Sequence, residues 1–365
     1  MLEGFRIFKD SMRKKIKGRK KYDGNAEDVC RQIITDCYNV EKNYFMVSPG
    51  HFNQFYMRDF GMVCEALLNL GYEEEVKSTL TYALTCYSDA DEITTQISPG
   101  GVPINFPYYT PESLAYLVRC LKLLNDQELL EKYKYFIIRK TEEVVHDELD
   151  VTGLLRKDKY YSSMKDHSKR LSSCYNNCLV AMLKKDLEYL GWPNPLENVD
   201  VKKAVKKTFW NNSYFYEDTA KEEVITGDAN VFAYWCDVFT DKDMFEKSMQ
   251  HMKTTKLDVP FPLKYRNDKK GRFNFADVLV NGYEKDTVWI HLGLCYMQTL
   301  HKFQKSSELK KHLISYTKKV NEHQNFLEVY TSKGKPFKSL LYECEESMIW
   351  CASYLDLITK TKLVS

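Results

Sequence analysis

The chain has 365 residues, which is long enough for one large domain or two smaller ones. Hydrophobic residues make up 44% of it, so it can bury a sizeable core, and its formal net charge of +2 is too balanced to favour a nucleic-acid or polyanion partner. No apolar run is long enough to cross a bilayer and no apolar signal core begins the chain, so we expect no membrane partner and a cytoplasmic location.

The eleven cysteines lie singly along apparent helices, without the spacing of a disulfide framework, which is typical of reduced thiols in a cytosolic protein. Cys174 and Cys178 are one helical turn apart and His167 is close in sequence, but no second pair of ligands completes a four-ligand zinc site. We therefore expect neither a metal nor a cofactor. The oligomeric state does not follow from the sequence.

A basic segment, MRKKIKGRKK at residues 12–21, precedes the first clear helical pattern. It could contact RNA or a membrane, but a solvated arm is the simpler interpretation. We expect this arm to occupy residues 1–25 and a single domain to occupy residues 26–365, because no low-complexity linker divides the rest of the chain.

Helical periodicity recurs along the whole chain. The expected helices span residues 26–40, 60–71, 72–87, 111–125, 127–146, 173–191, 200–210, 228–239, 241–254, 284–304, 306–324 and 345–360. Many of them are joined by short turns, which make consecutive helices antiparallel neighbours. Six such hairpins arranged in a ring would form an all-α fold, an (α/α)6 toroid whose inner helices are the core.

Longer irregular stretches lie between the hairpins, at residues 88–110, 147–172, 260–283 and 325–343. They hold most of the prolines and glycines, together with aromatic residues and carboxylates, and short hairpins could lie within them. In a toroid these loops would gather at one rim, where functional residues concentrate.

The segment 44–71 combines aromatic residues with an Arg-Asp pair at the junction of a loop and a helix. Asp59 lies near the N-terminal end of that helix, where the helix dipole favours an ionised carboxylate. Such a carboxylate can accept hydrogen bonds from two sugar hydroxyls while rings such as Tyr56 cover the apolar face of the sugar. A capped helix in which Arg58 and Asp59 form a surface ion pair explains the same residues.

Other candidate residues also have structural explanations. Tyr108 lies in the Pro- and Gly-rich loop 98–113 and either stacks on a sugar or plugs the loop. Asp166 lies in a polar loop and either donates a proton from a cleft or caps the following helix. Asp228 opens a helix and is most simply its N-cap. Trp289 lines a pocket or belongs to the core.

The last candidates surround residues 325–350. Glu328 stands between apolar residues, so that solvation explains it poorly. Glu345 and Glu346 fit the first turn of a helix, where they would complement its dipole. Two carboxylates on opposite sides of a cleft are what glycoside hydrolysis requires, and Asp166 and Glu328 would both lie on the loop rim of a toroid.

The motif YMRDF at residues 56–60, followed by ALLNLGYEEEVKSTLTYAL, resembles the first conserved block of the six-hairpin glycosidases. This superfamily includes glucoamylase, the glucosidase part of glycogen debranching enzyme, trehalase, processing α-glucosidase and neutral invertase; the RDF form is especially similar to neutral invertases. GDANVF at 227–232, NGY-x4-VW at 281–289 and FLEVY-x3-GKPF-x12-W at 326–350 are similar to later blocks.

The resemblance implies an inverting glycoside hydrolase with one (α/α)6 catalytic domain and a small-molecule carbohydrate substrate, such as an α-glucoside or small oligosaccharide. It implies that Asp166 is the general acid and Glu328 the general base. Residues 162–165 read SSMK, where trehalases and processing glucosidases have Glu-Ser-Gly before the acid, so Asp166 departs from their pattern. The expected substrate-binding residues are Tyr56, Arg58, Asp59, Tyr108, Asp228, Trp289 and Glu346.

Two other classes of function use the same toroid. A sugar epimerase would need paired histidines across the cavity, which eight scattered histidines do not obviously supply, and an unsaturated-glycuronyl hydrolase is a related alternative. A carbohydrate-binding or regulatory relative without chemistry would have two acids that cannot face each other.

Overall fold

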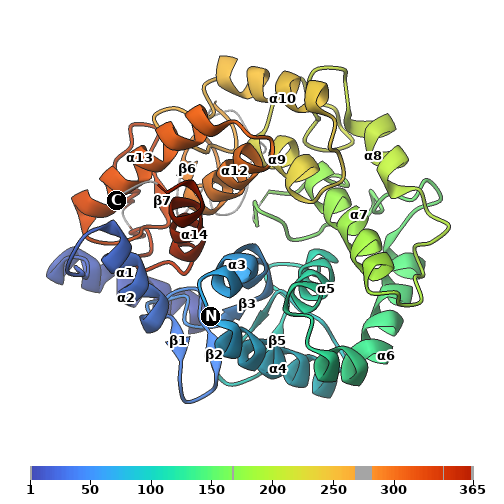
Figure 1. Ribbon diagram of the computed structural model, residues 1–365, viewed down its shortest axis with the longest axis horizontal. Coiled ribbons are helices and arrows are strands. Elements are labelled where there is room, and N and C mark those ends of the chain that lie inside the picture. Colours follow the sequence, from blue (N-terminus) through green and yellow to red (C-terminus); the bar gives the residue numbers. More distant parts are fainter. Residues whose placement is uncertain (1, 167, 268–281, 340, 363–365) are drawn as a thin grey trace.

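The computed structural model describes residues 2–166, 168–267, 282–339 and 341–362, and within them the helices close into a ring (Figure 1). Each inner helix contacts the next, and the last contacts the first. In chain order the described inner helices are α3 (Met57–Asn69), α5 (Glu112–Leu124), α7 (Cys174–Tyr189), α9 (Gly227–Trp235), α12 (Ile290–Lys302) and α14 (Cys351–Thr361). The expected (α/α)6 toroid is confirmed.

An outer layer of helices surrounds this ring (Figure 1). The described outer helices are α2 (Ala26–Asp36), α4 (Glu73–Ala90), α6 (Gln127–Glu143), α8 (Val201–Phe209), α10 (Lys242–Thr254) and α13 (Ser306–His323), and a short π-helix, η1 (Val144–Glu148), extends α6. Most outer helices follow their inner partner directly in sequence. The exception is α2, which packs on α14 and α13, so the ring closes only where the two ends of the chain meet.

The two layers differ in how their side chains are buried. Every residue of α9 is buried, because an inner helix has helices on either side and loops or outer helices around them. By contrast, α4 buries one stripe at helical spacing, from Val76 through Leu80 and Leu84 to Tyr87. This contrast explains why α4 has an amphipathic pattern, whereas α9 has no solvent-facing polar side.

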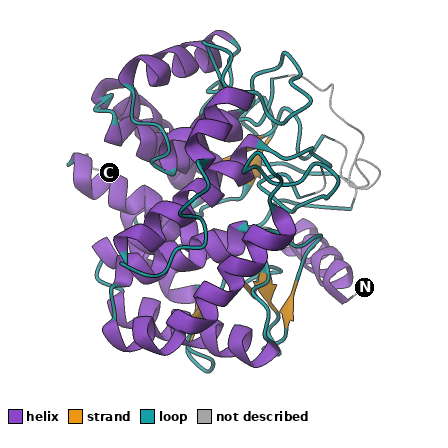
Figure 2. Ribbon diagram, turned by 90° about the vertical axis from the view of Figure 1, so that its right-hand side faces the viewer, coloured by secondary structure: helices purple, strands orange, loops and turns teal. Residues whose placement is uncertain are grey.

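Short strand pairs organise the loops, as expected. Most of the long loops and most of these strands lie toward the side of the ring where α1 (Leu2–Lys17) is found (Figure 2). The described strands are β1 (Tyr38–Asn39), β2 (Tyr44–Phe45), β3 (Phe55–Tyr56), β4 (Gln96–Ile97), β5 (Pro103–Ile104), β6 (Val288–Trp289) and β7 (Val329–Tyr330). They form the antiparallel pairs β1–β2 and β6–β7 and the three-stranded sheet β3–β4–β5. β3 and β6 each lead directly into an inner helix.

The helix boundaries differ from the predicted ones in informative places. The helix α3 begins at Met57, so Arg58 and Asp59 belong to its first turn and do not precede it. The helix expected from residue 284 begins at Ile290, because Val288 and Trp289 pair with β7. Gly71, expected to stop α3, has the left-handed backbone φ of 90° that favours glycine.

The N-terminal segment is not a solvated arm. Residues 2–17 form α1, and the Lys14 side chain on it is fully buried. Arg6 donates to Asn53 at 2.7 Å, and Arg13 pairs with Glu346 at 2.8 Å. Because α1 contacts loops from both ends of the chain, its basic residues serve internal ion pairs; a division into an arm and a catalytic domain stays a prediction.

The structure can be compared with two expectations from the sequence, one about the cysteines and one about membrane-crossing helices. All eleven cysteines are free, and Cys86 is half-buried while the others are buried. The Sγ atoms of Cys174 and Cys178 are 3.9 Å apart, whereas His167 lies outside the described residues. In the part of the chain that the structure describes, no helix combines the length and apolar character that a bilayer crossing needs.

Substituting Gly61 by alanine should destabilise the protein, because a Cβ atom there would lie 2.4 Å from Cδ1 of Tyr116 on the neighbouring helix α5. Overpacking of this kind costs about 1–3 kcal/mol, which exceeds the roughly 1 kcal/mol that alanine gains in a helix. Urea denaturation measures the change. Gly100→Ala is the control, because its nearest neighbour would be Ser98 Oγ at 3.6 Å; equal stability of the two variants would contradict the close packing of α3 on α5.

Candidate functional site

Arg58 links two inner helices and a long loop. Its Nε atom donates to Glu112 Oε1 at 2.9 Å, and its Nη2 atom donates to Asp166 Oδ1 at 2.8 Å. Glu112 is 1% exposed, whereas the Asp166 side chain is 33% exposed. The guanidinium is therefore anchored on the buried carboxylate and holds the more accessible one, which places Arg58 and Asp166 in the same site.

Asp59 follows Arg58 in the first turn of α3 and accepts a hydrogen bond from Trp350 Nε1 at 2.8 Å. Burial raises the pKa of Asp59 to about 6, and Arg58 and Trp350 offset this effect only in part. The helix dipole was expected to favour the ionised carboxylate, but desolvation outweighs it. The Asp59 carboxyl group therefore changes its protonation state about one pH unit below neutrality.

Aromatic rings connect Asp59 to Glu328. The Trp350 ring lies 4.5 Å from His291, His291 lies 5.2 Å from Trp289, and Trp289 lies 4.7 Å from Tyr283. Burial, followed by the nearby Arg58 charge, keeps the pKa of His291 well below its usual value, so this imidazole is neutral. These edge-to-face and tilted contacts form a continuous row of rings between the two carboxylates, called the aromatic wall below.

Glu328 is 2% exposed and accepts three hydrogen bonds. The hydroxyl of Tyr283 donates to Oε1, the hydroxyl of Tyr342 donates to Oε2 at 2.5 Å, and the backbone N–H of Glu345 donates to Oε2 at 2.8 Å. The pairing of β6 with β7, in which Trp289 is opposite Val329, sets Glu328 beside the start of α12. Its burial agrees with the expectation that solvation does not explain it.

The loop that carries Asp166 contacts the turn that holds Glu328. Ser168 Oγ donates to Glu284 Oε2 at 3.2 Å, and the preceding residue, Tyr283, contacts Glu328. Asp166 and Glu328 are thus separated by a short chain of contacts, although they are far apart in sequence. The structure brings five of the expected site residues into one network, namely Arg58, Asp59, Asp166, Trp289 and Glu328.

Two of the expected aromatic residues lie at the edge of this network. Tyr56 is half-buried, and its hydroxyl accepts from Gln54 at 3.0 Å. Tyr108 is 40% exposed and its ring lies 6.5 Å from Tyr160. Ser162 Oγ donates to the Tyr108 carbonyl at 2.8 Å, which fastens the Tyr108 loop to the loop of Asp166. An exposed ring on this support remains available for stacking.

Asp228 and Glu346 do not join the network. Asp228 is fully buried, its Oδ2 atom pairs with Arg170, and the N-cap of α9 is Thr226, so the cap assignment is wrong. Glu346 accepts from Arg13 at 2.8 Å and from the backbone N–H of Lys20 at 2.9 Å. The expected dipole role of Glu345 and Glu346 is also wrong, because α14 begins at Cys351. Sugar binding by Asp228 and Glu346 stays a prediction that these contacts do not favour.

Several residues of the network were not among the predicted site residues. Tyr283 and Tyr342 hold Glu328, Glu112 anchors Arg58, and His291 belongs to the aromatic wall. Glu112 carried a signal in the sequence, because it is the one acidic residue of α5 and lies in its first turn. Tyr342 and Tyr283 carried no such signal, because they contact a carboxylate that is 14 and 45 residues away from them, respectively.

Two clusters among the described residues have side chains suited to a metal ion. Asp258, Glu308 and His312 form one, but Glu308 already accepts from Lys253 at 2.5 Å and from Tyr296 at 3.0 Å. Asp10, His51 and Glu345 form the other, in which a lysine side chain is also present. Neither cluster contains Asp59, Asp166 or Glu328.

No protein-family model matches the chain, and no curated protein matches it in sequence. Solved structures do match. A rhamnosidase from Klebsiella oxytoca with rhamnose bound has a TM-score of 0.67 and 10% identity, over 93% of this chain and 63% of its own. A glycosidase in complex with glucose has a TM-score of 0.65 and 10% identity, over 93% of this chain and 98% of its own.

A GH63 mannosylglycerate hydrolase from Thermus thermophilus, in complex with Tris, has a TM-score of 0.65 and 11% identity, over 92% of this chain and all (100%) of its own. The chain has a glycosidase fold. At such low identities these similarities establish the architecture alone, so the chemistry has to be argued from the side chains of the site.

Asp59→Asn should raise the melting temperature at pH 8 and change it little near pH 4. The folded protein holds a proton on Asp59 up to a pKa of about 6, whereas the unfolded chain releases it near 3.8. Stability from this group therefore falls as the pH rises between these values, and the variant avoids the cost of the buried charge. Thermal denaturation across this pH range, with the exposed Asp23→Asn as control, measures the effect. The same gain at pH 4 and pH 8 would contradict it.

Proposed function

We propose that the protein is a glycoside hydrolase. The observation that carries this proposal is Glu328, a buried carboxylate held by two tyrosine hydroxyls and a backbone N–H beside an aromatic wall, within a glycosidase fold. Hydrogen bonds from three directions fix the carboxylate in one orientation, as a general base requires.

The other residues of the network take roles that follow from their chemistry. The Asp59 carboxylate accepts hydrogen bonds from sugar hydroxyls and Arg58 donates them, while Trp350 and Trp289 offer apolar faces. Glu328 removes a proton from the attacking water. Asp166, once it has left its ion pair with Arg58 and taken up a proton from solvent, gives that proton to the departing oxygen.

The finer assignment is an inverting enzyme that acts on an α-glucoside or a small oligosaccharide. It rests on the resemblance of the RDF block to glucosidases and neutral invertases. Structures of the same architecture act on different sugars, since one is a rhamnosidase and another a mannosylglycerate hydrolase, so the fold does not select the sugar. Proton NMR of the first anomer released from a disaccharide distinguishes inversion from retention.

One observation bears on the epimerase alternative. His291 is a neutral imidazole in the site, next to Trp350 and within hydrogen-bonding distance, 3.2 Å, of the Tyr265 hydroxyl. An epimerase needs a second histidine to act with it. Incubation with free monosaccharides in deuterated water tests this directly, because epimerisation exchanges a carbon-bound proton and hydrolysis does not.

Glu328→Gln should lower kcat by about 10²–10⁴-fold, because the amide keeps the shape of the side chain and cannot accept the proton of water. Steady-state kinetics on a panel of nitrophenyl glycosides and disaccharides measures this loss. The melting temperature shows whether the variant is folded. A folded variant with near-wild-type kcat would contradict the role of Glu328.

The loss of activity in Asp166→Asn should depend on the leaving group of the substrate. Nitrophenolate departs without protonation, so the variant should lose far more activity on a disaccharide than on the corresponding nitrophenyl glycoside. Asp158→Asn is the matched control, since this exposed residue of the same loop pairs only at the surface with Arg156. Equal losses on both substrates would contradict the role of Asp166 as acid, and the same signature in Asp59→Asn would transfer that role to Asp59.

A further inference from the structure

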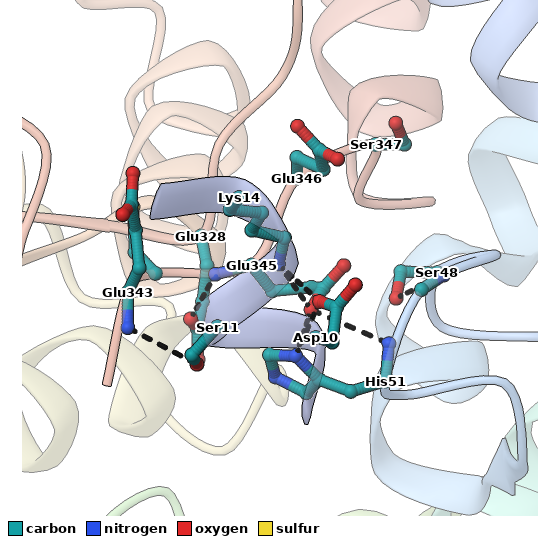
Figure 3. A network of polar contacts seen from close by, with 12 residues as sticks. Asp10, Ser11, Lys14, Ser48, His51, Glu328, Glu343, Glu345, Glu346 and Ser347 are labelled. Carbon is teal, nitrogen blue, oxygen red and sulfur yellow. Dashed lines mark hydrogen bonds and ion pairs between the residues drawn. The ribbon is translucent and has the colours of Figure 1, made fainter. Parts of the chain in front are cut away.

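The helix α1 inserts a buried lysine among residues of two loops (Figure 3). The Lys14 side chain has no exposed surface, and its Nζ atom lies 2.7 Å from Asp10 Oδ2 and 2.8 Å from Glu345 Oε2. Asp10 comes from α1 itself, whereas Glu345 is 331 residues away in sequence. The ammonium group therefore joins α1 to the loop that precedes α14.

His51 completes this cluster from the loop that leads into α3. Its Nδ1 atom lies 3.0 Å from Asp10 Oδ2 and contacts Glu345 Oε2, and its backbone N–H donates to Glu345 Oε2 at 3.4 Å. Burial disfavours the charged imidazole, but Glu345 and Asp10 outweigh it and raise the pKa of His51 above its usual value. The partly buried Asp10 carboxylate and the buried Glu345 carboxylate thus face the Lys14 ammonium and the His51 imidazole ring.

Asp10, His51 and Glu345 are residue types that bind metal ions, and their ligand atoms lie within 4.8 Å of one another. The Lys14 ammonium lies within hydrogen-bonding distance of both carboxylates. A lysine side chain therefore supplies positive charge at the position where a metal ion would supply it. Because this charge belongs to the Lys14 side chain, its position depends on how α1 packs.

The cluster is coupled directly to Glu328. The backbone N–H of Glu345 donates to Glu328 Oε2 at 2.8 Å, and the backbone N–H of Glu328 donates to the carbonyl of Glu345 at 3.0 Å. The two residues therefore exchange hydrogen bonds at the backbone of Glu345, while Lys14 holds the side chain of that same residue. Ser11 on α1 adds a second link, because its Oγ atom accepts from the backbone N–H of Glu343 at 3.2 Å.

We propose that Lys14 is a positioning residue, whose ammonium fixes Glu345 and thereby holds Glu328 in the orientation that activates water. This inference rests on the proposed function of Glu328 and extends it to a helix outside the ring. A lone buried cation would be costly, but the carboxylates of Asp10 and Glu345 compensate the charge of Lys14. The ion pair with Glu345 in turn positions the backbone N–H of Glu345, which donates to Glu328.

The test compares Lys14→Met with Lys17→Met, an exposed lysine on the same helix. Hydrogen exchange at the amides of residues 341–346 should be faster in Lys14→Met and unchanged in Lys17→Met. On a nitrophenyl glycoside, kcat of Lys14→Met should fall about 10–100-fold with little change in KM, because the base is displaced and the sugar contacts remain. Lys14→Arg should recover part of the loss.

A second variant reaches the same cluster from another side. A Cβ atom on Gly50 would lie 2.1 Å from Glu345 Oε1, so Gly50→Ala should displace the Glu345 carboxylate and reproduce both changes with Lys14 intact. This variant also decides the matter if Lys14→Met fails to fold. The proposal would be overturned if the folded variants exchanged these amides at the wild-type rate or kept the wild-type kcat. Faster exchange throughout the ring, rather than at these amides alone, would also overturn it. If the wild-type protein hydrolyses no glycoside, the proposed function fails, while the exchange measurement still decides whether Lys14 holds this loop.

Discussion

The structure depends on the contact that closes the ring, where α14 packs between α12 and α3. At this seam the Trp350 indole donates to Asp59, across 291 residues of sequence. Without this closure the two halves of the candidate site would not meet, because Arg58 and Asp59 come from the first hairpin while Glu328 comes from the loop before the last helix. The fold and the site thus share one requirement, and the candidate chemistry is available only to the completed ring.

Burial of charge is the second theme of the site. Arg58 compensates Glu112 and Asp166, Lys14 compensates Glu345, and three uncharged donors surround Glu328. Isolated buried charges are very costly, so each carboxylate inside the ring has to be matched by donors or cations of its own. At Asp59 the nearby Arg58 and Trp350 offset the cost of burial only in part, and the raised pKa of Asp59 reflects this. A carboxylate that is costly to ionise in the free protein is a group whose charge can be stabilised by the hydroxyls of a bound sugar.

Local patterns in the sequence were sufficient to predict the helices that form the ring, although α1 was not among them. Outer helices such as α4 bury a stripe at helical spacing, and short turns at Gly71 and Asn125 predicted their antiparallel pairing. Arg58 and Asp59 lie in the first turn of α3, close to the N-terminal end of the helix that the local pattern indicated. These features depend on neighbours a few residues apart, which is the range over which periodicity and turn chemistry are informative.

Contacts between distant segments were not predictable in this way. Lys14 reads as one cation of a basic run, and nothing near it in sequence indicates that it is buried against Glu345. The same reason accounts for Glu346, which pairs with Arg13, and for Asp228, which pairs with Arg170. The pKa of Asp59 was also misjudged, since its position in a helix is a local property and its desolvation depends on the whole ring.

The pairing of α2 with α14 has a consequence for biosynthesis. A growing polypeptide emerges from the ribosome with α2 well before α14, so α2 waits for its partner while residues 37–350 are translated. During that interval the apolar stripe of α2, which includes Val29 and Ile33, lacks its cover. The ring can therefore close only after α14 has been synthesised, and until then the apolar stripe of α2 stays exposed.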